Sequence, residues 1–122
     1  MEIRKEQMDA LGEAQEDSFR ERLKEMLEED YPEDCEDLGD TLDAVIHLGL
    51  ERARAHGIER EKDIGLYFDI MFTLAYNFDT NPDYPWAAKI LKQSGLSAKT
   101  KLQRVAALAQ EALEQEAQNA ED

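Results

Sequence analysis

Residues 41–58 read TLDAVIHLGLERARAHGI, and this segment carries the clearest helical pattern in the chain. Its apolar side chains recur at steps of three and four residues and so share one helix face: Leu42, Val45, Ile46, Gly49, Leu50 and Ala53. Asp40 or Thr41 is a suitable N-cap. Gly57 followed by Ile58 is typical of a left-handed C-cap with a hydrophobic contact. We therefore predict a helix that begins after this N-cap and ends at Gly57.

A second helical pattern precedes this segment. Residues 2–30 contain no proline, and their apolar side chains form a stripe at helical spacing. The stripe ends at Tyr31-Pro32, because a proline disfavours helical geometry in the residue before it. Between this helix and the next, residues 28–40 are predicted to form an acidic connector.

Three more helices are predicted on the C-terminal side. Residues 59–78 are apolar on most sides, which is typical of a helix at the centre of its fold. Pro85 suits the first position of a short helix that stops near Gly95. Ser97 is the expected N-cap of a last helix, whose polar end is predicted to fray from Glu114 onward.

These elements and the size of the chain predict one all-α domain. The 122 residues suffice for one compact core, and 42% of them are apolar. We predict a single helical bundle of four long helices plus one short helix over residues 1–122. Within it, residues 28–40 are the acidic connector and residues 114–122 are a frayed acidic tail.

The net charge excludes several classes of function. The chain has 29 acidic and 14 basic residues, which give a formal net charge of -15. Such a surface repels phosphate backbones and anionic lipids, so we expect no nucleic-acid partner and no membrane partner. No stretch is long and apolar enough to span a bilayer, and residues 1–8 lack the apolar region of a signal peptide. We therefore expect a cytoplasmic protein whose partner is a protein with a basic surface.

The acidity is concentrated at the two ends of the chain. Residues 1–40 carry a net charge of -11, residues 41–108 of +1 and residues 109–122 of -5. The densest run, residues 28–40, has eight carboxylates. It is interpreted as a solvated connector or as a contact face for a positively charged protein. Under the second interpretation the partner-binding residues of this run are Glu28, Glu29, Tyr31, Glu33, Asp34, Glu36 and Asp37.

Seven of the nine aromatic residues lie within residues 67–86. The phenylalanines of this stretch are expected in the core: Phe68, Phe72 and Phe78. Tyr84 and Trp86 have two interpretations, because they lie on a loop and at the start of the short helix. They pack back on the core, or they anchor a protein partner, so both are candidate partner-binding residues.

Asp69 interrupts the apolar segment 59–78 and also has two interpretations. It faces solvent, or its carboxylate pairs with Arg52 or Arg54 of the preceding helix. The pair would fix how the two helices pack.

One group of polar residues on a predicted helix is a candidate metal site. Asp43, His47 and Glu51 follow one another at four-residue steps and so share one face. A carboxylate-type site in a helical bundle, however, needs Glu-x-x-His pairs on facing helices. We interpret this group as a solvated polar face and expect no metal there.

A second group resembles the start of a calcium loop. Asp79, Asn81 and Asp83 match the opening D-x-N-x-D of an EF-hand. The sixth position is Tyr84 instead of the glycine that the turn needs, and the twelfth is Ile90 instead of a bidentate glutamate. We expect no calcium there, and we expect the two aspartates to cap turns and the short helix.

The sequence contains no recognisable catalytic arrangement. Cys35 is the only cysteine, and its acidic neighbours should raise its thiol pKa and make it a poor nucleophile. The six glycines are scattered singly, so no phosphate-binding loop is present. We predict a protein that is not an enzyme and that needs no cofactor.

Three segments together resemble a family. They are residues 3–8 (IRKEQM), residues 52–58 (RARAHGI) and residues 78–87, with Phe78-Asp79, Pro82 and Pro85-Trp86-Ala87. The order and content of these segments resemble small helical accessory proteins of Gram-negative bacteria that are encoded in type VI secretion loci, near spike and effector genes.

The resemblance implies an accessory protein that acts by binding another protein. One implied role is a chaperone or adaptor for a secretion effector or spike component. The alternative is an immunity protein that occludes the active site of a toxin, where acidity would complement a basic surface. A third interpretation, independent of effectors, is a self-assembling structural or regulatory bundle, that is, a homo-oligomer.

Overall fold

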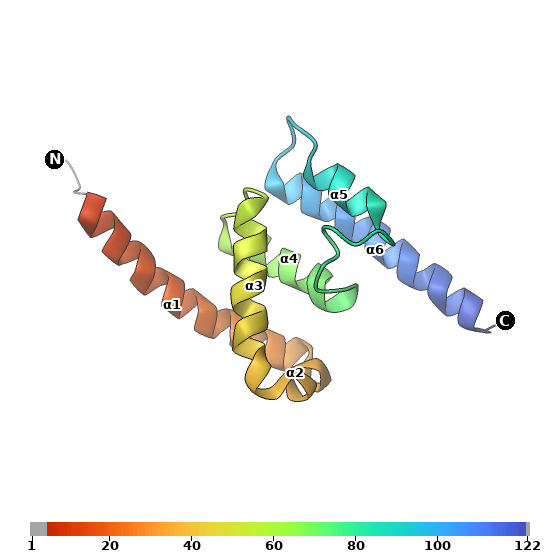
Figure 1. The fold of residues 1–122 in the computed structure, drawn as a ribbon, viewed down its shortest axis with the longest axis horizontal. Helices are drawn as coiled ribbons and strands as arrows, with labels where there is room; N and C mark the ends of the chain where they lie inside the picture. The colour runs from red at the N-terminus through yellow and green to blue at the C-terminus, as the bar shows by residue number, and fades with distance from the viewer. Residues whose placement is uncertain (1–4, 122) are drawn as a thin grey trace. The chain divides into compact units, whose positions relative to one another are not determined.

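The computed structural model describes residues 5–121, with side chains described for residues 17–118. Its elements, in chain order, are α1 (Lys5–Asp30), α2 (Pro32–Leu38), the 3₁₀ helix η1 (Gly39–Thr41), α3 (Leu42–Ala55), α4 (Glu61–Thr73), α5 (Pro85–Leu91) and α6 (Ala98–Glu121) (Figure 1). No strand occurs in this part of the chain, so the prediction of an all-α fold is confirmed. None of these helices has both the length and the apolar character needed to cross a membrane.

The chain folds as two compact units, Met1–Ile46 and His47–Asp122, whereas the sequence predicts one domain over residues 1–122. The division falls inside α3, because the first turn of this helix packs in the first unit and the rest belongs to the second. The charge divides in the same way. The first unit has 17 acidic and 5 basic residues, whereas the second has 12 acidic and 9 basic residues.

The first unit corrects the prediction of an acidic connector over residues 28–40. The last turn of α1, then α2 and η1, cover nearly all of this run. Pro32 lies at the first position of α2, where its fixed φ favours the helix. Glu33 and Asp34 lie in the first turn, where negative charge interacts favourably with the helix dipole. The predicted end of α1 at Tyr31-Pro32 is confirmed, since Tyr31 leaves helical geometry with φ of -131°.

Two features mark the passage from α2 into α3. Gly39 has a positive φ of 53°, which ends α2. The predicted N-cap of α3 lies within η1, and Thr41 Oγ1 donates a hydrogen bond to the carbonyl of Leu38 at 2.6 Å. The hydroxyl therefore closes the preceding turn, whereas an N-cap would accept from an amide of the following helix.

The predicted end of α3 is confirmed. Gly57 has a φ of 77°. Its amide donates to the carbonyl of Arg54 at 2.9 Å, and the amide of Ile58 donates to the carbonyl of Ala53 at 2.9 Å. These two bonds are the Schellman arrangement, in which an apolar contact between Ile58 and Ala53 is typical, and both of these side chains are buried.

Close packing of α3 on α4 depends on Gly49. A Cβ atom at this position would come within 2.7 Å of Phe68 Cε1 and 3.1 Å of Met71 Cε. Both of these side chains are buried, so neither has space to move away. The glycine therefore permits the two helices to approach at this point.

The core of the second unit lies around α4. Tyr67, Phe68 and Phe78 are fully buried, which confirms the prediction for the last two. Phe72 is only half-buried, so its assignment to the core is wrong. Its ring instead packs edge-on against exposed Tyr76, with 6.1 Å between the ring centroids.

Helix α4 is shorter than the predicted segment 59–78. It ends at Thr73, and turns replace it from Leu74 onward. The early end has a physical reason in the packing of the next residues. Phe78 lies against Tyr67 with 4.9 Å between ring centroids, and Asp79 pairs with Arg52 of α3.

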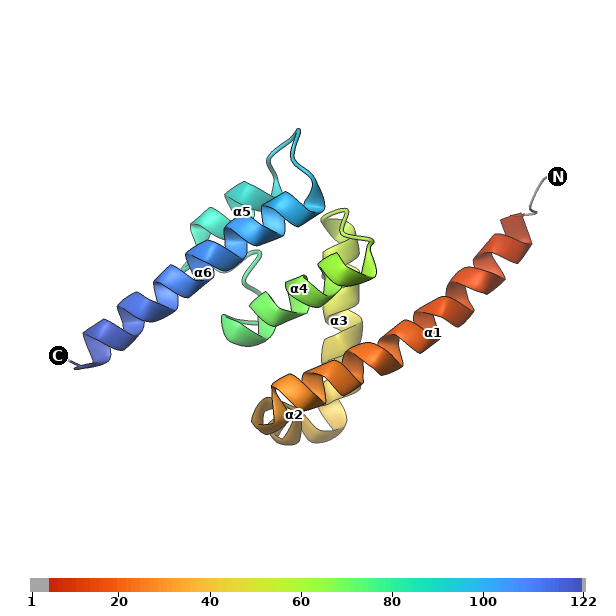
Figure 2. The same ribbon diagram turned by 180° about the vertical axis from the view of Figure 1, so that it is seen from behind.

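Helices α5 and α6 pack against each other and α6 also packs on α4, as Figures 1 and 2 show. The short helix from Pro85 to Leu91 is confirmed. Ser97 Oγ accepts a hydrogen bond from the amide of Thr100 at 3.2 Å, which confirms it as the N-cap of α6. Helix α6 continues to Glu121, so residues 114–121 of the predicted frayed tail are helical in the structure, and Asp122 lies outside the described residues. Its tail, ALEQEAQNAE, consists almost entirely of strong helix formers.

Candidate protein-binding surface

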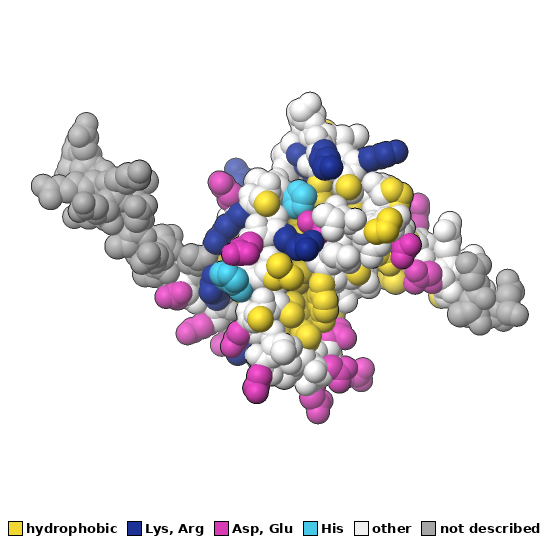
Figure 3. Space-filling model, viewed as in Figure 1, with side chains coloured by type: hydrophobic (Ala, Val, Ile, Leu, Met, Phe, Trp, Pro, Cys, Tyr) yellow, Lys and Arg dark blue, Asp and Glu magenta, His cyan; other side chains and the backbone are white. Residues whose placement is uncertain are grey.

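The carboxylates of the predicted contact face are displayed on the surface of the first unit. We call the following exposed residues the acidic face: Glu28, Glu29, Glu33, Asp34, Glu36 and Asp37. The last turn of α1 holds the first two and α2 holds the other four. Figure 3 shows magenta side chains around α2. Residues 28–40 contain no lysine or arginine, so no cation within this run neutralises the face.

One inward residue orients α2. The side chain of Cys35 is only 8% exposed and is the buried member of this helix, so the carboxylates on either side of it in sequence point to solvent. Burial raises the pKa of the Cys35 thiol, and the charges of Glu28 and Asp34 raise it further. The thiol therefore stays protonated and unreactive at neutral pH. Tyr31, also predicted in the face, is half-buried between the two helices.

A shallow groove of about 370 Å³ lies beside the acidic face. Its lining residues are Lys24, Glu28, Pro32, Cys35, Glu36, Gly39 and Leu42. The ammonium of Lys24 lies 3.1 Å from Asp43 Oδ1. The hydrogen bond to Asp43 and the charge of this carboxylate raise the pKa of Lys24. The one cation of the groove is thus paired with a carboxylate outside the acidic face.

Tyr84 and Trp86 belong to the second unit, whereas the acidic face belongs to the first. Their rings lie edge-to-face with 5.8 Å between centroids, at the start of α5. Both side chains are half-buried, whereas Ala87 and Leu91 of the same helix are buried. The pair therefore packs partly on the protein and leaves part of each ring accessible, which leaves both interpretations of these residues open.

A buried polar cluster joins α3 to the loop after α4, and sequence reasoning missed it. Arg52 Nη1 lies 2.6 Å from Asp79 Oδ1, and His56 Nε2 lies 2.9 Å from Asp79 Oδ2. Asp79 is only 5% exposed. The sequence predicts that Asp69 faces solvent or pairs with Arg52 or Arg54, and that Asp79 caps a turn. Basic residues in the last turn of α3 were the only signal, and they do not identify a carboxylate 27 residues away.

Tyr67 lies against this cluster with its hydroxyl buried. The hydroxyl makes no hydrogen bond of standard geometry among the described residues and is close enough to Asp79 for a weak interaction only. Burial raises the pKa of Tyr67, and the negative charge of Asp79 raises it further, while Arg52 opposes the shift. The cluster is a structural anchor with one uncharged phenol beside it.

The two candidate metal sites of the sequence contain residues that contact other side chains or the backbone. Asp43 pairs with Lys24, and His47 Nε2 lies 3.0 Å from Glu51 Oε1. In the loop, Asn81 Oδ1 accepts a hydrogen bond from the amide of Asp83 at 2.9 Å. Within the described ranges, no three His, Cys, Asp or Glu residues are grouped so that they could hold a metal ion.

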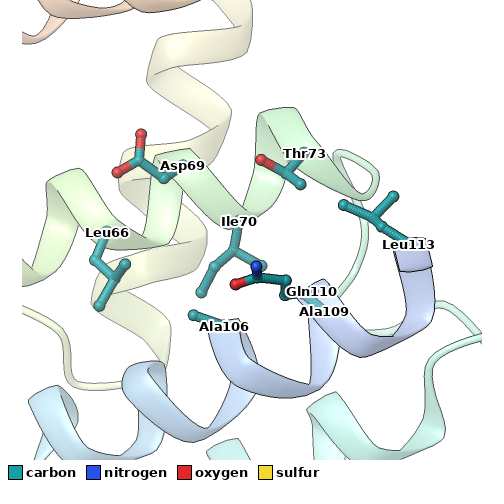
Figure 4. A pocket seen from close by; sticks show the side chains of 8 residues that line it. All are labelled: Leu66, Asp69, Ile70, Thr73, Ala106, Ala109, Gln110 and Leu113. Carbon is teal, nitrogen blue, oxygen red and sulfur yellow. The ribbon is translucent and has the colours of Figure 1, made fainter.

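An apolar groove of about 370 Å³ is lined by α4 and α6 within the second unit (Figure 4). It is lined by Leu66, Asp69, Ile70, Thr73, Ala106, Ala109, Gln110 and Leu113. Asp69 lies half-buried at its edge, and in Figure 4 its carboxylate points away from α6.

Comparison with protein-family models, with curated proteins and with solved structures found no match to this chain.

Proposed function

We propose that this chain is a non-enzymatic accessory factor that binds a protein with a basic surface through the acidic face. The resemblance to accessory proteins of type VI secretion loci suggests a chaperone or adaptor that holds a secretion effector or spike component in the cytoplasm. The observation that carries the proposal is the display of six exposed carboxylates on two helix segments without a cation among them.

Helical presentation of these carboxylates supports a binding role over a solubilising one. A disordered acidic run samples many arrangements and loses that freedom on binding. Here α1 and α2 hold the carboxylates in fixed relative positions, with Cys35 buried beneath them, so less ordering is required. Fixed like charges also speed the approach of a basic surface.

Co-expression tests the proposal and separates the two roles that the resemblance implies. Each protein encoded beside this chain's gene is expressed with it and without it, and soluble yield and complex formation are measured by size-exclusion chromatography with light scattering. We expect one neighbouring product to gain solubility and to elute with the chain. The absence of any complex at low salt would contradict the proposal. Restored growth of cells that express a toxic neighbour, without a change in its solubility, would indicate the immunity role instead.

A further inference from the structure

The second unit carries a surface of opposite charge. Residues 84–110 contain five basic residues and no acidic residue. We call these residues the basic face: Lys89, Lys92, Lys99, Lys101 and Arg104. All except half-buried Lys101 are exposed. In Figure 3, dark blue side chains without magenta neighbours lie around the connection between α5 and α6, at the top of the view.

Contacts between α5 and α6 bring these cations together. Lys101 Nζ donates a hydrogen bond to the carbonyl of Leu91 at 3.0 Å, so the start of α6 lies beside the end of α5. Lys92 directly follows α5, while Lys99 lies in the first turn of α6. The N-terminal end of α6 adds the positive pole of its dipole to the same place. The basic face is therefore a positive surface around the connection between α5 and α6, on a chain whose net charge is -15.

We propose that the basic face binds the acidic face of a second copy of this chain. This inference rests on the proposed function, because both assign protein binding to the acidic face. It adds that one protein bound there is a second copy of this chain, through its basic face. The argument is charge complementarity. One surface of this chain has eight carboxylates and no cation over residues 28–40, and the other has five cations and no carboxylate over residues 84–110. A phosphate backbone would meet the same cations, and the measurement with duplex DNA described below distinguishes that occupant from a second copy.

The contact joins two different surfaces, so it is heterologous. Each copy keeps a free acidic face and a free basic face after one contact forms, and longer assemblies follow unless the contacts close into a ring. An external basic partner would occupy the acidic face and thereby compete with self-association.

Two variants that each lose one face test this arrangement. The acid-neutral variant carries E33Q, D34N, E36Q and D37N. The base-reversed variant carries K92E and K99E, and its matched control carries R60E and K62E, which reverse two exposed cations at the start of α4. Sedimentation velocity measures association over a range of concentrations at 0.1 M and 1 M salt, and circular dichroism checks the helix content of every variant.

We expect the wild type and the R60E/K62E control to form species above 14.0 kDa at 0.1 M salt and to dissociate at 1 M salt, where the Debye length falls from about 10 Å to about 3 Å. Each face variant alone should associate at least about tenfold more weakly, which corresponds to about 1.4 kcal/mol. Mixed together, the two variants should form a 1:1 complex and nothing larger, because each retains one native face.

Other outcomes overturn the inference. A wild type that stays monomeric at 0.1 M salt overturns it, and the proposed function still stands if an external basic partner binds the acidic face. Self-association that both face variants retain overturns it as well, as does a mixture without the 1:1 complex. A basic face that binds short duplex DNA while the protein stays monomeric would show that its occupant is nucleic acid.

Discussion

Arg52 and Asp79 lie 27 residues apart in sequence and meet with 2.6 Å between Nη1 and Oδ1. This contact ties the end of α3 to the loop between α4 and α5, and His56 binds the second oxygen of the same carboxylate at 2.9 Å. Because Asp79 is buried, these two contacts of its carboxylate replace the water that the carboxylate has lost.

Substitution of Asp79 by alanine should therefore destabilise the fold. We expect the free energy of unfolding to fall by about 3 kcal/mol, because removal of the buried carboxylate leaves Arg52 and His56 without the group that they contact. Chemical denaturation followed by circular dichroism measures the change. Asp83→Ala, which removes an exposed carboxylate from the same loop, should change stability by less than about 0.5 kcal/mol. Equal effects of the two substitutions would contradict the role assigned to Asp79.

Replacement of two glycines in neighbouring helices by alanine should change the stability of the fold in opposite directions. At Gly49 the new methyl group would overlap buried Phe68, and we expect a loss of about 1–2 kcal/mol after the gain in helix propensity. At Gly65 in α4 a Cβ would meet nothing within 4 Å, so Gly65→Ala should stabilise by up to about 1 kcal/mol. Thermal denaturation of both variants checks the pair. A stabilising Gly49→Ala would show that α3 and α4 do not approach as described.

Tyr67 should make the fold sensitive to alkaline pH. Its pKa is raised in the folded state, so the folded protein binds this proton more tightly than the unfolded chain does. Stability should then fall as the pH rises above the unfolded value of about 10. Tyr67→Phe should remove this part of the fall and should cost less than about 1 kcal/mol at pH 7, since the hydroxyl makes no hydrogen bond of standard geometry among the described residues. Denaturation at pH 7 and pH 11 measures both effects. An unchanged alkaline loss in the variant would refute the assignment to Tyr67.

Cys35 should react slowly with alkylating reagents in the native protein. Its thiol is buried and its pKa is raised by burial and by nearby carboxylates, so little thiolate reaches the reagent. We expect alkylation by iodoacetamide, followed by mass spectrometry, to be at least about tenfold faster in the denatured chain. Similar rates in the two states would mean that α2 does not bury this side chain.

The sequence was informative where a local signal determines local structure. Gly57 and Ser97 marked a helix end and a helix start correctly, because each cap depends on residues within one turn. Sequence reasoning failed where distant contacts decide. The end of α4 at Thr73 depends on the packing of Phe78 against Tyr67, which no apolar pattern reveals.

The same difference between local signals and distant contacts applies to the acidic face and the basic face. The carboxylates of the acidic face could be found in the sequence, because a dense charge run without cations stays at the surface in almost any fold. The sequence did not predict that a helix displays these carboxylates. Helix α2 buries only Cys35, so its sequence has no amphipathic pattern. The basic face was also missed, because its five cations are spread over 16 residues and meet only when α5 packs on α6.

The dissociation constant of the complex with a basic partner tests the acidic face most directly. The acid-neutral variant is compared with a matched control that carries E59Q, E111Q, E114Q and E116Q, four exposed carboxylates of the second unit. Isothermal titration calorimetry at 0.1 M salt measures each constant. The acid-neutral variant should bind at least about tenfold more weakly than the wild type, and the control should stay within about twofold. Equal constants for the two variants would contradict the claim that this face binds the partner.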